Sequence, residues 1–247
     1  MTQDLFTSAK SVFRRANHHI TNLKSEINVS TPDKPYSYTV DVESDGTTQK
    51  HKFKFSESFS DDIACIMFDA INNLRSCLDQ MTHAIARKHR GPSKNFAYFP
   101  ICRDRVHWAN RIKGMKNDLP AEIASLFEYF QPYKGGNDAL WAVNYMANIK
   151  KHDVLIPVDF GRAVLWESSP GNDTIIHKVW DKNEIEFTTP GTDFGRNREF
   201  SFSIVVRDAE EVVNDKSPVT LLDAMSREVE RVLVGTEAEC RRIGLIP

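Results

Sequence analysis

The feature that most constrains the fold is a change of hydrophobic period after residue 152. Before that point apolar residues recur mostly at spacings of three and four, which places them along one stripe of a helix. Beyond it, apolar and polar residues alternate as in half-buried strands, in five runs at 154–160, 162–168, 174–180, 185–189 and 198–206. The two periods together predict an α+β fold, in which the five runs form one antiparallel meander.

The helical part is interrupted once and resumes at the end of the chain. Helical spacing predicts helices at 5–27, 61–90, 103–113, from 118 onward and at 138–152. Residues 36–55 alternate around Asp45-Gly46 and predict a β-hairpin, and Ser217-Pro218 opens a last helix. We therefore expect an N-terminal antiparallel helical bundle with an inserted β-hairpin, followed by an antiparallel β-sheet and a C-terminal helix. The domains would be 1–153 and 154–247, unless the sheet packs on the helices within one domain.

Composition excludes several classes of protein. The 247 residues carry 32 Lys and Arg against 34 Asp and Glu, and only four cysteines. No apolar run reaches the ~18 residues of a membrane span, and the N-terminus lacks the order of a secretion signal. We expect a cytoplasmic protein with no membrane partner. No phosphate-binding loop or dinucleotide fingerprint occurs, so no cofactor is expected, and the cysteine spacing suits no metal finger.

Two predicted helices carry polar stripes. Arg75, Asp79 and His83 share one face of the helix at 61–90, and Asn148 and His152 share a face of the helix at 138–152. Large aromatic residues accompany the second stripe, so the two helices are candidates for the facing walls of a catalytic cleft. The alternative is that the stripes are solvated faces, with an ordinary ion pair at i,i+4 and a histidine favoured by the helix C-terminus.

Several short motifs resemble those of a family of uncharacterised bacterial proteins of similar length. They are Asn73–Gln80 (NLRSCLDQ), Phe99–Ile101 (FPI), Gln131–Tyr133 (QPY), Gly136-Asn137, Leu140-Trp141 and Asn148–His152 (NIKKH). The resemblance covers about the first 155 residues and implies no activity.

A more distant resemblance is to HEPN domains, helical bundles that often act as metal-independent RNases. Their motif has an Arg followed by a His on a core helix. This resemblance implies a general base on a ribose hydroxyl, a guanidinium on the phosphate and a homodimer that builds the site across its interface. Here Gln80 stands where the motif has His, so His83 or His152 would supply the imidazole beside Arg75.

Residues 87–116 form a basic segment. Nine Lys and Arg face one acidic residue, Asp104, and four aromatic residues lie among them. Such a composition is typical of a surface that holds phosphates and stacks bases, with Arg103, Arg105, Arg111 and Lys113 as candidate RNA contacts. The alternative is that the acidic C-terminal helix neutralises the segment and the aromatic residues enter the core.

The function that these patterns favour is engagement of RNA or nucleotides, with RNA cleavage in defence or stress as an extension. A non-catalytic interaction or scaffold protein is the alternative. A second alternative is a metal-dependent hydrolase with Asp79, His83 and His152 as ligands, although no further metal motif accompanies them.

Overall fold

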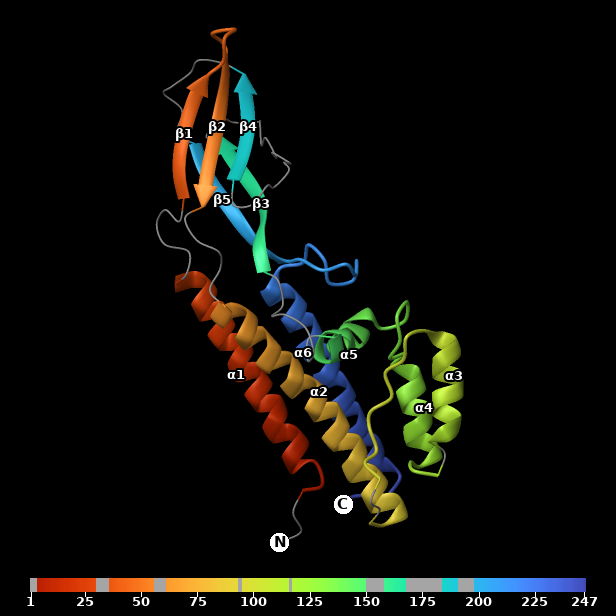
Figure 1. The fold of residues 1–247 in the computed structure, drawn as a ribbon. Helices are drawn as coiled ribbons and strands as arrows, with labels where there is room; N and C mark the ends of the chain where they lie inside the picture. Colours follow the sequence, from red (N-terminus) through yellow and green to blue (C-terminus); the bar gives the residue numbers. More distant parts are fainter. Residues whose placement is uncertain are drawn as a thin grey trace. The chain divides into compact units, whose positions relative to one another are not determined.

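The computed structural model describes residues 4–29, 36–55, 61–92, 95–115, 117–149, 158–167, 184–190 and 198–247. The chain forms two compact units that interleave along the sequence (Figure 1). The helical unit comprises Met1–Lys24, Ala64–Ile156 and Val219–Pro247, and the strand unit comprises Ser25–Ile63 and Pro157–Pro218. The expected domains, 1–153 and 154–247, follow the order of the sequence. The two units instead follow secondary-structure type, since the hairpin joins the later strands and the last helix joins the first ones.

Three long helices form the body of the helical unit: α1 (Thr7–Val29), α2 (Asp61–Arg90) and α6 (Pro218–Arg242). Side-chain contacts show that α1 runs antiparallel to α6, because Lys10 pairs with Glu237 while Lys24 pairs with Asp223. The buried stripe of α2 supplies much of the core, with Met67, Ile71, Leu74, Leu78 and Met81 all fully buried. These helices and the α+β class confirm the expectation from hydrophobic spacing.

Three shorter helices complete the unit: α3 (Arg105–Gly114), α4 (Ala121–Tyr129) and α5 (Asp138–Ile149). Asp104 caps α3 by accepting a hydrogen bond from the amide of residue 107 at 2.9 Å, and Asn137 caps α5 by accepting one from the amide of residue 140 at 3.1 Å. None of the helices in the described ranges is long and apolar enough to cross a bilayer.

The strand unit contains two small antiparallel sheets. The hairpin strands β1 (Tyr36–Val42) and β2 (Thr48–Phe55) pair as expected, and β2 pairs on its other edge with β4 (Glu184–Pro190). The second sheet joins β3 (Val158–Glu167) to β5 (Arg198–Val206).

The single meander of five strands is therefore wrong. The runs at 154–160 and 162–168 contribute to one strand, β3, and the run at 174–180 lies outside the described residues. Charge helps to explain why β4 joins the hairpin, because Glu186 pairs with Lys50 at 2.8 Å and with Lys52 at 2.9 Å across the strands. Alternation predicts that a run is a strand but does not choose its neighbour.

Candidate functional site

The polar stripe of α2 holds the segment 96–99, which follows that helix in the sequence. Asp79 Oδ1 accepts a hydrogen bond from the backbone amide of Phe99 at 2.9 Å and lies 2.9 Å from Arg75 Nη2. The same Arg75 nitrogen donates to the carbonyl oxygen of Phe99 at 3.0 Å. Both side chains are only 15% exposed. We call this three-residue arrangement, Arg75, Asp79 and Phe99, the backbone clamp, because both polar groups of one peptide residue are held by one ion pair.

His83 extends the same contact by one further turn of α2. Its Nδ1 lies 3.3 Å from the backbone nitrogen of Ala97, so it accepts that amide proton. The neutral ring then carries its own proton on Nε2. Burial lowers the pKa of His83, and the nearby Arg90 and Arg87 lower it further. His83 is therefore a neutral hydrogen-bond donor at pH 7 with its acceptor nitrogen already used.

The clamp divides the segment into a buried and an exposed side. Ala97 and Phe99 point into the core, where the Phe99 ring meets that of Phe127 edge-on at 4.7 Å. Phe96 and Tyr98 remain 43% and 51% exposed, with ring centroids 4.9 Å apart. Phe96 also stacks on His83, with centroids 4.0 Å apart and planes within 8° of parallel. The polar stripe thus presents an aromatic surface beside α2.

A second guanidinium lies near the clamp. Arg75 has its pKa lowered, first by burial and then by the charge of Arg111, while Asp79 acts in the opposite direction. Arg75 Nη1 is buried and has no hydrogen-bond partner among the described residues. Arg75 is therefore influenced both by the carboxylate of Asp79 and by a second cation, Arg111.

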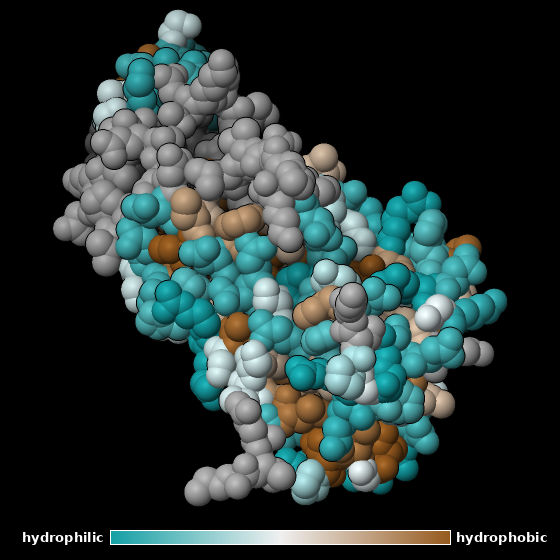
Figure 2. Space-filling model, turned by 60° about the horizontal axis from the view of Figure 1, so that its bottom comes forward, coloured by the Kyte–Doolittle hydropathy of each residue, from teal (hydrophilic) through white to brown (hydrophobic). Residues whose placement is uncertain are grey.

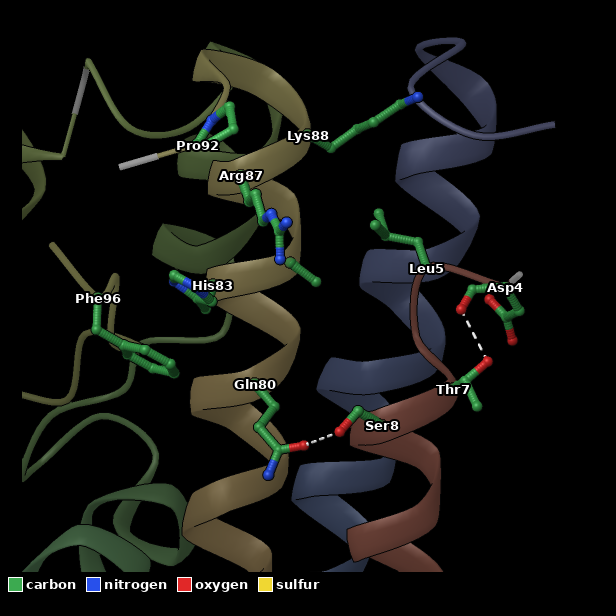
Figure 3. Close-up of a pocket in the computed structure, with 11 residues that line it drawn as sticks. Asp4, Leu5, Thr7, Ser8, Gln80, His83, Arg87, Lys88, Pro92 and Phe96 are labelled. Carbon is green, nitrogen blue, oxygen red and sulfur yellow. Dashed lines mark hydrogen bonds between the residues drawn. The ribbon is translucent and has the colours of Figure 1, made fainter. Parts of the chain in front are cut away.

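A groove of about 620 Å³ opens where the start of α1 faces the last turns of α2 (Figure 3). Ser8 Oγ donates to Gln80 Oε1 at 2.5 Å and joins the two helices on one side of the groove. His83, Arg87 and Phe96 line the part of the groove that α2 and the 96–99 segment supply. Figure 2, which brings the lower end of Figure 1 forward, shows apolar atoms gathered among hydrophilic ones on this end of the unit.

The groove was not apparent from the sequence as a site. Ser8 and Gln80 are 72 positions apart, and no motif connects them. Arg87 and Phe96 were part of the basic segment only by composition. The signal that could have pointed to the groove is the i,i+4 spacing of His83 and Arg87, which places both on one face of a helix.

For the second polar stripe the structure describes only a contact within α5. Asn148 is exposed and donates to Asn144 Oδ1 at 2.9 Å, one turn earlier on α5. His152 lies outside the described residues. A catalytic centre that combines Arg75, Asp79 and His83 with Asn148 and His152 stays a prediction. No group of three potential metal ligands occurs in the described ranges, and the metal hypothesis likewise depends on His152.

The four arginine and lysine residues expected to contact RNA all lie in or next to α3 and are exposed: Arg103, Arg105, Arg111 and Lys113. Arg103 is paired at 3.3 Å with Asp104, and Arg90 is paired at 2.9 Å with Asp118. Four acidic residues of α6 form ion pairs elsewhere: Asp223 with Lys24, Glu228 with Arg231, Glu237 with Lys10 and Arg241, and Glu239 with Arg242.

The aromatic residues of the basic segment divide evenly. Trp108 and Phe99 are buried, at 3% and 1% exposure, as the core interpretation expects. Phe96 and Tyr98 stay at the surface, as the base-stacking interpretation expects. One pair of rings, Trp108 and Phe99, therefore packs in the core, and the other pair, Phe96 and Tyr98, is exposed to solvent.

Comparison of the chain with models of protein families, with curated proteins and with solved structures gives no match.

Proposed function

We propose that the helical unit binds single-stranded RNA on the surface formed by Phe96, Tyr98 and the exposed cations of residues 87–113. The observation that carries the proposal is the backbone clamp, which holds the segment whose Phe96 and Tyr98 rings stay exposed, in a stretch of chain that also carries exposed Arg and Lys side chains. Exposed rings stack on bases, and nearby cations hold the phosphates between them. RNA binding agrees with what the resemblance to HEPN domains implies, and we place this activity in the cytoplasm.

Binding is better supported than cleavage. A general base needs a free lone pair, and the Nδ1 of His83 accepts the amide of Ala97. Arg75 and Asp79 already hold the peptide of Phe99. These contacts also favour the second candidate, a non-catalytic interaction protein in which the stripe organises the helical unit. RNA binding without cleavage accommodates both observations.

The test is the salt dependence of RNA binding, measured by fluorescence anisotropy with a labelled single-stranded oligonucleotide. Each phosphate contact contributes a log–log slope of about −0.7 for single strands. Changing Arg103, Arg105 and Arg111 together to Gln should flatten the slope by about two units. The matched control changes three exposed arginines outside this surface, Arg14, Arg15 and Arg227, to Gln and should leave the slope within about half a unit.

The aromatic contribution is tested separately. Tyr98→Ala should weaken binding at every salt concentration without changing the slope, because stacking on a ring releases no counterions. RNA binding that is undetectable at low ionic strength, or that does not depend on salt, would overturn the proposal and leave the interaction protein as the better reading. Light scattering tests the predicted homodimer independently.

A further inference from the structure

The groove between α1 and α2 differs from the rest of the basic surface because it combines an aromatic stack, a neutral donor and unpaired cations. Arg87 and Lys88 are exposed, and no carboxylate pairs with either of them in the part of the chain that the structure describes. Arg87 lies one turn beyond His83 on α2, so both side chains face the groove (Figure 3).

Among the described residues that line the groove, the one carboxylate, Asp4, is already paired. Asp4 Oδ2 pairs with Lys10 at 2.8 Å, and its Oδ1 accepts the amide of Phe6 at 3.1 Å. These bonds hold the pKa of Asp4 below its ordinary value, so it remains an anion. Lys10 and Arg241 together offset the charges of Asp4 and Glu237. The groove keeps a positive charge from Arg87 and Lys88.

We propose that this groove binds a terminal phosphomonoester of single-stranded RNA, with the terminal base on the stacked rings of Phe96 and His83. Arg87 holds the phosphate through charge-assisted hydrogen bonds, and the Nε2 proton of His83 donates to the same group. A volume of about 620 Å³ is in the range of pockets that bind a small ligand. A terminal phosphate carries nearly two charges at pH 7, whereas an internal phosphodiester carries one. The Arg87 cation beside the neutral donor His83, with Lys88 also lining the groove, therefore favours the end of a strand.

This inference deepens the proposed RNA binding and can be tested without it. Calorimetry with adenosine, 5′-AMP, 3′-AMP and inorganic phosphate measures the groove alone. We expect at least one of the two AMP isomers to bind about tenfold or more tightly than adenosine, and the better isomer identifies the end of the strand. Arg87→Gln should remove that advantage, whereas Arg227→Gln, on α6 and outside the groove, should preserve it within about twofold.

The protonation of His83 gives a second measurement. In the free protein its pKa is lowered by burial and by Arg90 and Arg87. A phosphate that compensates Arg87 and accepts from Nε2 should raise that pKa, and NMR titration of the ring should show the rise with the better AMP isomer. A histidine that only supports Ala97 would keep the same pKa with and without the ligand.

Three uridine oligonucleotides of equal length then connect the groove to RNA. They carry a 5′-phosphate, a 3′-phosphate or a hydroxyl at both ends. A preference of about fivefold or more for one phosphorylated end, lost in Arg87→Gln, supports the inference. If all three oligonucleotides bind equally and binding still depends on Arg103 and Arg105, the proposed phosphate site in the groove is wrong and the proposed RNA binding stands. Binding of AMP that depends on Arg87, with no RNA binding, supports the groove and overturns the proposed function.

Discussion

Replacing Asp79 by Ala tests the backbone clamp most directly. The change removes the partner of Arg75 and the acceptor of the Phe99 amide in one step. Removing one partner of a buried ion pair costs about 3–5 kcal/mol, and a buried amide left without an acceptor costs about 1–3 kcal/mol. Because the two side chains are 15% exposed, water can reach the stranded groups in part. We expect a loss of about 3 kcal/mol in the free energy of unfolding of the helical unit.

Two further variants separate the charge from the hydrogen bond. Asp79→Asn keeps an oxygen for the Phe99 amide but loses the charge that faces Arg75, so we expect about half of the loss. The control is Asp223→Ala, which breaks the exposed pair with Lys24, whose side chains are 45% and 41% exposed. That variant should lose no more than about 1 kcal/mol.

Urea unfolding followed by circular dichroism measures the free energies of unfolding of Asp79→Ala, Asp79→Asn and Asp223→Ala. Hydrogen exchange at the Phe99 amide reports on the clamp itself. Exchange at this amide should be faster in Asp79→Ala and close to that of the native protein in Asp223→Ala. If Asp79→Ala and Asp223→Ala were equally stable, the clamp would contribute nothing to the fold. The argument that it presents Phe96 and Tyr98 would then be wrong.

The remaining predictions concern a helix cap and the effect of pH. Asn137→Ala should lower the free energy of unfolding by about 1–2 kcal/mol, because Asn137 caps α5 and also donates to Glu228 Oε2 at 2.6 Å. Asn137→Asp keeps the cap but places a second carboxylate beside Glu228, so an Asn137→Asp variant as stable as the native protein would refute the contact with Glu228. Burial is the main cause that lowers the pKa values of His19 and His83 below the ordinary 6.5. As the pH drops from about 7 to 5 the unfolded chain therefore binds protons at these histidines before the folded protein does, and the free energy of unfolding should decrease. A His19→Gln, His83→Gln double variant should show a flatter profile in that window, and an unchanged profile would contradict the assignment.

Hydrophobic periodicity predicted the helices because it reports on burial, and burial decides where a helix lies. The apolar stripe along the 30 residues of α2 and the cap at Asn137 could both be predicted from residue types alone. The same argument failed for strand order. Alternation in β4 is compatible with any neighbouring strand. The pairing with β2 is favoured by a charge match between Glu186 and Lys50, two residues 136 positions apart in the sequence.

The polar stripe on α2 was also predicted, but its partners were not. Arg75 and Asp79 bind the backbone of Phe99, and His83 binds the backbone of Ala97. Every residue except proline carries the same amide and carbonyl groups, so the residue types at positions 97 and 99 do not predict these backbone hydrogen bonds. Sequence reasoning therefore considered side-chain partners on another helix, Asn148 and His152, and that catalytic arrangement stays a prediction.

The backbone clamp consists of one acceptor side chain and one donor side chain because the 96–99 segment runs beside a helix. A peptide that runs beside a helix cannot pair with it as a strand pairs with a strand, because the backbone groups in the interior of a helix already bond to each other. Within the helix, only side chains are available to form hydrogen bonds with the backbone groups of such a segment. Asp79 supplies the acceptor for the amide of Phe99, and Arg75 supplies the donor for its carbonyl oxygen. A catalytic acid or base must instead keep its proton-transferring atom open to substrate. The stripe of α2 meets the first requirement at Arg75 and Asp79, whereas the Nε2 proton of His83 and the guanidinium of Arg87 face the groove. The structural support at Arg75 and Asp79 and the proposed ligand binding at His83 and Arg87 thus fall on successive turns of one helix.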